Sequence, residues 1–204
     1  MKKYLTEFIG TLFLVATVGN AVLNGTTLAP IPIGLMLMVM IYAGGHVSGA
    51  HYNPAVTVAV WLRGRCSTKD AIPYIIAQIA GGVVAALIVG YLRGKGTPGD
   101  IQIGPAFVGE MLGTFALAYV VLNSATAKAN AGNSFYGAAI GMTVTAAAFA
   151  LGDLSGGAFN PAVAIGASLM GLIKTSNLWL YLIACPVAGA LAAIVFRQIN
   201  PDDK

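Results

Sequence analysis

A glycine-rich theme that ends in Asn-Pro-Ala occurs twice in this chain, with the two copies 107 residues apart. The copies span residues 45–56 and 152–163 and share the pattern Gly-x-x-Ser-Gly-small-x-aromatic-Asn-Pro-Ala-Val. Asparagine is a favoured helix N-cap because its side-chain oxygen accepts from the first-turn N–H groups. Proline suits the next position, where its missing N–H leaves no helical hydrogen bond unmade. The two copies therefore predict two helix starts, each preceded by a glycine-rich loop. The motif residues are Asn53, Pro54, Ala55, Asn160, Pro161 and Ala162.

Charged side chains are scarce in the sequence, at 9% of the 204 residues, whereas 57% are hydrophobic. Soluble domains are about a quarter charged, so this chain cannot cover a water-facing surface and is predicted to be an integral membrane protein. Its net charge of +4 then reflects topology and does not indicate a nucleic-acid partner. Cys66 and Cys185 have neither metal-ligand spacing nor a disulfide framework, so we expect no metal and no other cofactor.

Six apolar stretches reach the roughly 17 to 25 residues that a helix needs to span a bilayer. They cover about 4–24, 31–47, 71–92, 106–126, 135–151 and 178–197. The segments after the two Asn-Pro pairs, about 53–63 and 160–171, are much shorter. At 1.5 Å per residue, a helix of about 11 residues crosses about half of a 30 Å hydrocarbon core. These two segments are therefore predicted to be half-helices.

The basic residues predict how the chain is oriented in the membrane. With both termini in the cytoplasm, eight Lys and Arg residues lie inside and three outside, which agrees with the positive-inside rule. The inner set is Lys2, Lys3, Arg63, Arg65, Lys69, Lys128, Arg197 and Lys204, and the outer set is Arg93, Lys95 and Lys174. We expect a multi-pass protein with cytoplasmic termini, and the short loops suggest a prokaryotic plasma membrane.

Other blocks of the sequence repeat in the same order as the Asn-Pro-Ala copies. The block that begins at Glu7 is echoed by the block at Glu110, and the block at Tyr74 by the block at Tyr181. This pattern indicates a duplication, in which residues 1–204 form one channel domain built of two halves, about 1–95 and 105–204. Each half holds an odd number of spans, so the second half enters the membrane from the opposite side.

The expected fold is an all-α membrane protein with six transmembrane helices, two re-entrant half-helices and an inverted-topology repeat. Irregular backbone at membrane depth is tolerated only where it is buried in protein or lines a water-filled cavity. The half-helices should therefore meet near the midplane, where Asn53 and Asn160 form the waist of a pore.

These residues resemble the aquaporin/glycerol-facilitator (major intrinsic protein) family over essentially the whole chain. The resemblance rests on the paired Asn-Pro-Ala motifs, the six spans, the Ser-Gly-x-His sequence before the first motif, and a glutamate in spans one and four. It implies a homotetramer in the lipid bilayer, with each subunit passing water or small neutral solutes passively through its own pore. It also implies that Glu7 and Glu110 are buried acceptors for the loop backbone.

The family has an outer filter in which an arginine follows the second Asn-Pro-Ala motif, and here that position is Val163. Counting back from the motifs places the other filter positions at Ile33, Ala148 and Gly157. These four residues predict a mouth that is wide and apolar, which admits solutes such as glycerol, urea or ammonia. An apolar ring can also dewet, so the effect on the water rate is left open.

The remaining polar residues have more than one interpretation. His46 and His51 are expected to brace the first re-entrant loop, with pH gating as the alternative, since histidine titrates near physiological pH. Asp153 lies near the predicted outer mouth, where loop bracing and a functional role are both open.

Two other kinds of protein are compatible with parts of the sequence. A secondary transporter also uses inverted repeats and broken helices, and Glu7, Glu110 and Asp153 would be its candidate ion-coupling acids. A weakly conducting or structural homologue is the other alternative, because Val163 removes a family hallmark. No nucleophile–base pair or phosphate loop points to an enzyme.

Overall fold

The computed structural model describes residues 1–203, which form helices and connecting loops without any strand. Six helices are long and apolar enough to cross a membrane, as the sequence predicts. These are α1 (Lys2–Leu23), α2 (Pro30–Ser48), α4 (Thr68–Arg93), α5 (Ile103–Val121), α6 (Tyr136–Ser155) and α8 (Leu178–Ile199). The π-helical turn η1 (Leu122–Thr126) continues α5, and two short 3-10 turns, η2 (Lys128–Asn130) and η3 (Thr175–Asn177), lie in the connections.

Two of the helix ends are set by a following glycine, which the length of the apolar stretches alone does not indicate. Helix α2 continues to Ser48 and α6 to Ser155, and each is followed by a glycine in the left-handed conformation. Gly49 has φ 86° and Gly156 has φ 90°, which suits glycine because it has no Cβ atom. Both spans therefore run up to the re-entrant loops, and α6 ends four residues beyond the predicted 151.

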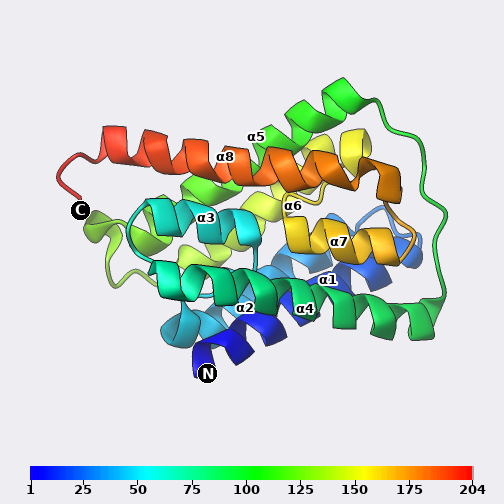
Figure 1. The fold of residues 1–204 in the computed structure, drawn as a ribbon, viewed down its shortest axis with the longest axis horizontal. Coiled ribbons are helices and arrows are strands. Elements are labelled where there is room, and N and C mark those ends of the chain that lie inside the picture. Colours follow the sequence, from blue (N-terminus) through cyan, green and yellow to red (C-terminus); the bar gives the residue numbers. More distant parts are fainter. Residues whose placement is uncertain (204) are drawn as a thin grey trace.

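Two short helices, α3 (Pro54–Leu62) and α7 (Pro161–Leu169), begin directly after the two motif asparagines. Each has nine residues, or about 13 Å of helix, which is less than half of the hydrocarbon thickness. In Figure 1 they lie end to end between α8 and α4, with their N-terminal ends facing each other at the middle of the molecule. The predicted half-helices are therefore present as re-entrant elements.

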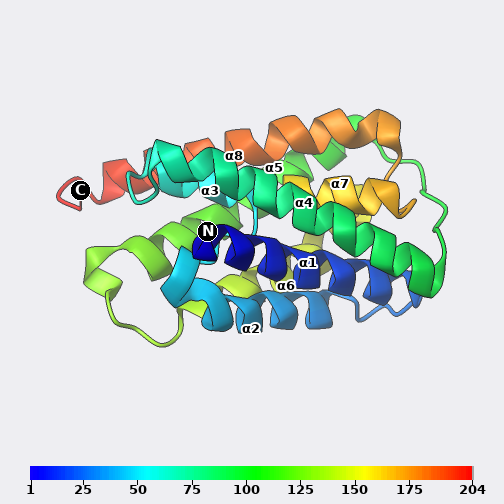
Figure 2. The same ribbon diagram turned by 60° about the horizontal axis from the view of Figure 1, so that its bottom comes forward.

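The long helices pack in pairs around the two short ones. Helix α1 lies along α4, α5 along α8, and α2 along α6, while α3 packs on α8 and α7 on α4. Figure 2 shows α1 lying between α4 and α2. Both described chain ends lie toward the same end of the bundle, as an even number of spans requires (Figures 1 and 2).

Glycines allow the short helices to come close to the long ones. A Cβ atom on Gly189 of α8 would lie 2.4 Å from the carbonyl oxygen of Ala55, at the start of α3. One on Gly82 of α4 would lie 2.8 Å from the carbonyl oxygen of Ala162, at the start of α7. Glycine at these positions fixes how deep the two helix starts sit in the bundle, as small residues do in membrane helix packing.

Candidate functional site

The site is built where α3 and α7 meet, and its first component is a pair of helix caps. Asn53 and Asn160 have extended backbones and precede the first helical residues. The side-chain oxygen of Asn53 accepts from the N–H of Ala55 at 2.8 Å, and that of Asn160 accepts from the N–H of Ala162 at 2.9 Å. Capping holds both side chains in fixed rotamers, so their amide groups point away from their own helices.

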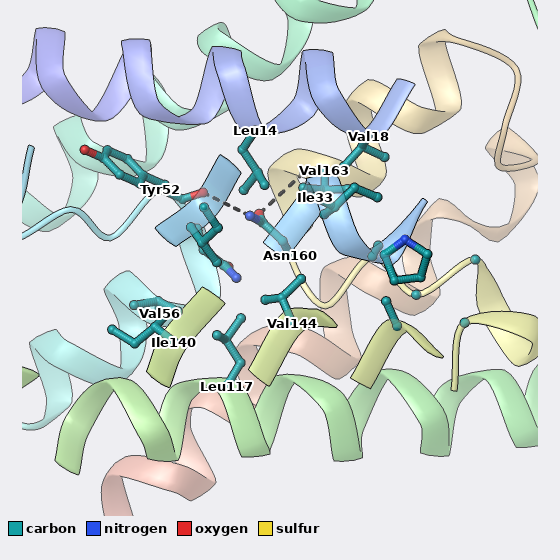
Figure 3. Close-up of a pocket in the computed structure, with 18 of the residues that line it drawn as sticks. Leu14, Val18, Ile33, Tyr52, Val56, Leu117, Ile140, Val144, Asn160 and Val163 are labelled. Carbon is teal, nitrogen blue, oxygen red and sulfur yellow. Dashed lines mark hydrogen bonds between the residues drawn. The ribbon is translucent and has the colours of Figure 1, made fainter. Parts of the chain in front are cut away.

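Each amide group then binds the loop of the other half. Asn53 Nδ2 donates to the carbonyl of Phe159 at 2.9 Å, and Asn160 Nδ2 donates to the carbonyl of Tyr52 at 2.9 Å. Figure 3 shows the second of these bonds. An asparagine amide carries two N–H groups, so one N–H on each side chain is left for a molecule in the adjoining cavity.

A buried glutamate in each half accepts hydrogen bonds from the loop that precedes the motif. Glu7 accepts from Ser48 Oγ at 2.6 Å and from the backbone N–H groups of His51 and Tyr52 at 3.0 and 2.7 Å. Gln78 Nε2 donates a fourth bond at 2.8 Å. The carboxylate thus satisfies backbone donors that would otherwise be buried without partners.

Glu110 repeats this arrangement in the second half. It accepts from Ser155 Oγ at 2.6 Å and from the N–H groups of Ala158 and Phe159 at 2.9 and 2.7 Å. Its fourth donor is the thiol of Cys185, at 3.5 Å, which stands where the first half has Gln78. The two carboxylates therefore hold the two loops with the same geometry.

The loops that these carboxylates hold are strained. Tyr52 has φ 51° and Phe159 has φ 48°, although bulky side chains disfavour the left-handed region. Both rings are fully buried, each over a glycine of a spanning helix, Gly10 for Tyr52 and Gly113 for Phe159. The strain turns the carbonyls of Tyr52 and Phe159 toward the opposite asparagines, and strain of this kind is typical of functional sites.

A cavity of about 270 Å³ adjoins the two asparagines. The four predicted filter residues, Ile33, Ala148, Gly157 and Val163, all line it. In Figure 3, Asn160 lies among aliphatic side chains from several helices. Apart from Asn53, Asn160, His51 and Tyr52, the lining side chains are apolar or absent.

Sequence reasoning missed part of this lining, because it considered only the motif and filter positions. Leu14 and Leu117 each lie seven residues after a bracing glutamate, and Val18 and Val121 eleven residues after. Residues spaced in this way share one helix face. Helical periodicity, applied to both copies of the repeat, identifies these four residues from the sequence.

A second cavity, of about 310 Å³, shares Ala50, Val121 and Ile140 with the first. It lies between the ends of α2, α5 and α6, and loop residues 130–133 form part of its wall. The two cavities thus adjoin, and the second lies toward the end of the bundle that carries the termini.

The two histidines differ in their surroundings. His51 is buried, and its Nδ1 lies 3.1 Å from Thr57 Oγ1, which in turn bonds the carbonyl of Asn53. His46 is exposed at the end of α2, and its side chain makes no hydrogen bond within residues 1–203. Only His51 therefore contacts the motif loop, while Asp153, at the matching end of α6, is exposed.

The fold and the site together define a pore-forming, multi-pass integral membrane protein. Residues 1–196 match the major intrinsic protein family, and the chain belongs to this family. Its members are channels that pass water and small neutral solutes, and this chain is a channel of that kind.

Named relatives cover the chain from end to end. It is 38% identical to "Glycerol uptake facilitator protein-like 6" of Lactiplantibacillus plantarum, over 100% of both chains. It is 32% identical to "Aquaporin Z" of Rhodopseudomonas palustris, over 98% of this chain and 94% of that one. The aquaglyceroporin structure from Plasmodium falciparum has the same fold, with a TM-score of 0.80 at 22% identity, over 98% of this chain and 94% of that chain. The predicted family and fold are confirmed.

Proposed function

We propose that this channel passes small neutral solutes such as glycerol, urea or ammonia together with water, through a wide, apolar outer filter. The observation that carries the proposal is the composition of the cavity wall: Ile33, Ala148, Gly157 and Val163 all line it. None of these residues offers a charge or a side-chain hydrogen bond. A solute that passes them is limited by size and by its own desolvation.

The waist of the pore provides the polar contacts. The N-termini of α3 and α7 face each other, and each carries about half a positive charge. A cation meets this field while it loses hydration, whereas a water molecule or a hydroxyl group can accept from the free amide N–H groups. We infer that Asn53 and Asn160 admit neutral hydrogen-bonding solutes and oppose cations.

The lining suits solutes that have one polar and one apolar edge. The motif loops supply backbone groups on one side of the cavity, and aliphatic side chains such as Leu14, Val18 and Val144 supply the other. The printed names of relatives include both a glycerol uptake facilitator and aquaporins, which supports a solute range wider than water.

We also propose that the chain is one channel domain of two inverted halves, about 1–95 and 105–204, and that four copies assemble. Matched hydrogen bonds support the inversion: Tyr74 and Tyr181 donate to the carbonyls of Ser48 and Ser155. The excess of basic residues on one side supports cytoplasmic termini, although Lys204 in that count lies outside the described residues. The short loops support a prokaryotic plasma membrane. We propose that Glu7, Glu110 and His51 brace the pore, whereas the exposure of His46 gives that residue no comparable support.

The test is stopped-flow light scattering on proteoliposomes with water, glycerol and urea gradients. Val163→Arg should lower glycerol and urea flux by about tenfold or more, equivalent to about 1.4 kcal/mol of added barrier, while water flux remains. Val163→Thr, which matches valine in shape, is the control and should keep the wild-type solute flux. Equal glycerol flux in the arginine variant and the wild type would contradict the role of Val163. Wild-type vesicles that pass water but neither solute would contradict the proposed solute range.

A further inference from the structure

The sequence repeat gives each residue of the outer filter a counterpart in the other half of the chain. Shifting the four filter positions by the 107-residue offset of the repeat leads to one residue each in α2, the first re-entrant loop, α3 and α6. These counterparts are Ile41 for Ala148, Ala50 for Gly157, Val56 for Val163 and Ile140 for Ile33. We call Ile41, Ala50, Val56 and Ile140 the inner ring. In Figure 3, Asn160 lies between Val163 on one side and Val56 and Ile140 on the other.

The inner ring lies where the two cavities of the pore meet. Val56 lines the cavity of about 270 Å³ next to the asparagines, and Ile41 lines the cavity of about 310 Å³. Ala50 and Ile140 line both. The outer filter is placed differently, because the first cavity continues past all four of its residues to Val22, in the last turn of α1. The open space along the pore is thus divided at the inner ring and is continuous at the outer filter.

The side chains of the inner ring are also the larger of the two sets. Isoleucine stands opposite alanine in one pair and alanine opposite glycine in another, while the other two pairs are identical. The inner ring is nearly inaccessible to solvent, with exposed fractions between 2% and 6%. In the outer filter, Ile33, Ala148 and Gly157 are partly exposed. Both comparisons make the inner ring the narrower of the two.

The backbone at Ala50 provides a further observation. Ala50 has φ 52°, in the left-handed region that favours glycine, and its counterpart Gly157 has φ 62°. Glycine would therefore suit position 50 as it suits position 157. Local conformation does not account for the methyl group of Ala50, which occupies space at the junction of the two cavities.

We propose that the inner ring is a second filter, which sets the size of the largest neutral solute that passes. The inference rests on the proposed passage of small neutral solutes, and it assigns their size limit to Ile41, Ala50, Val56 and Ile140. A solute at this ring meets only apolar side chains, so the ring selects by the diameter of the solute. The outer filter admits larger solutes than the inner ring allows to continue.

The test removes one methylene from each ring by the same substitution and measures flux in proteoliposomes by stopped-flow light scattering. Urea, glycerol and erythritol, a polyol one carbon longer than glycerol, form a series of increasing size. Ile140→Val should raise erythritol flux about tenfold, because one methylene at a tight apolar site is worth about that much. Ile33→Val, at the matched position of the outer filter, should raise it by a much smaller factor. Ile76→Val, at a residue of α4 that is 62% exposed, is the control and should keep the wild-type flux of all three solutes.

A second variant tests the ring without removing a large buried side chain. Ala50→Gly should fold, because its backbone conformation favours glycine, and it should also raise erythritol flux. Wild-type erythritol flux in both Ile140→Val and Ala50→Gly would overturn the proposal. Equal increases in Ile140→Val and Ile33→Val would overturn it too, because the outer filter would then limit size as strongly.

The same measurements separate this inference from the proposed function. Wild-type vesicles that pass water but neither glycerol nor urea would contradict the proposed solute range. The inner ring would then be tested by glycerol: the proposal holds if Ile140→Val and Ala50→Gly admit it, and fails if both exclude it as the wild type does.

Discussion

The close contact between Gly189 of α8 and the start of α3 predicts that a change in helix packing will change conduction. In Gly189→Ala, the new Cβ atom would lie 2.4 Å from the carbonyl oxygen of Ala55 and 3.2 Å from its carbonyl carbon. The first distance is about 1 Å short of the 3.4 Å at which ordinary contact begins. The atoms of Ala55 that the new Cβ atom meets belong to the backbone, and the Cβ atom is itself bonded to the backbone, so no side-chain rotation relieves the clash. Helix α3 must move away from α8 by about that amount.

This displacement should damage the waist of the pore. Asn53 caps α3, and its bond to the carbonyl of Phe159 is 2.9 Å long. A shift of about 1 Å takes such a bond beyond the range of a hydrogen bond. Overpacking of a well-packed core costs about 1–3 kcal/mol, whereas alanine gains up to about 1 kcal/mol over glycine in a helix interior. We expect a lower thermal midpoint and at least a severalfold loss of water flux.

Alanine substitutions at two other glycines of the spanning helices serve as comparison variants in this experiment. Gly82→Ala places its Cβ atom 2.8 Å from the carbonyl oxygen of Ala162, so its effect should be smaller. Gly90→Ala, on the same helix as Gly82, meets nothing within 4 Å and should conduct as the wild type does. Stopped-flow flux per reconstituted channel and thermal unfolding in detergent are measured for all three. If Gly189→Ala conducts as well as Gly90→Ala, the reasoning that the glycine sets the position of Asn53 is wrong.

Two further predictions concern the side chains that hold the site and the chain end. Glu7→Gln replaces one acceptor oxygen by an NH₂ group that faces two donors. Each buried donor left without a partner costs about 1–3 kcal/mol of stability. Both thermal stability and flux should therefore fall. A wild-type melting curve for this variant would refute the bracing role. Asp203 accepts from the N–H of Lys128 and pairs with buried Arg63 at 2.6 Å, and these contacts hold the pKa of Asp203 below its ordinary 3.8. Because the pKa of Asp203 is lower in the folded protein, its ionised carboxylate stabilises the fold at pH values above the ordinary pKa. This stabilisation is lost as the pH falls through the lowered pKa. Asp203→Asn should therefore reduce the thermal midpoint at pH 7 and flatten its decline below about pH 4. An unchanged pH profile in that variant would speak against the ion pair.

The elements of this fold could be predicted because their signals are local or repeated. Apolar length predicted the six spans, and the Asn-Pro pairs predicted the starts of α3 and α7 to the residue. The crossed bonds from Asn53 and Asn160 could not be predicted, because they join loops more than 100 residues apart. Their formation depends on the depth of two helix starts, which tertiary packing decides.

The conformations of Tyr52 and Phe159 lay outside sequence reasoning for a different reason. Local propensity disfavours a positive φ for a bulky residue, yet both adopt it. Burial of the two rings and the hydrogen bonds from their N–H groups to Glu7 and Glu110 override that preference. Sequence rules fail most often at functional sites, where strain is retained because the surroundings over-determine it.

The matched positions along the pore indicate where selectivity arises in this channel. Ile33 and Leu37 of α2 correspond to Ile140 and Val144 of α6, and all four line the same cavity. With Val163 in place of a charged residue, its counterpart Val56 has the same side chain, and both valines line the cavity that adjoins the asparagines. A wall of this kind cannot discriminate strongly among neutral solutes of similar size, because it forms no directional bonds. We therefore propose that chemical discrimination rests on the two asparagine amides. A variant that narrows the filter should change the size limit, whereas only a variant that moves the amides should change which groups a solute needs in order to pass.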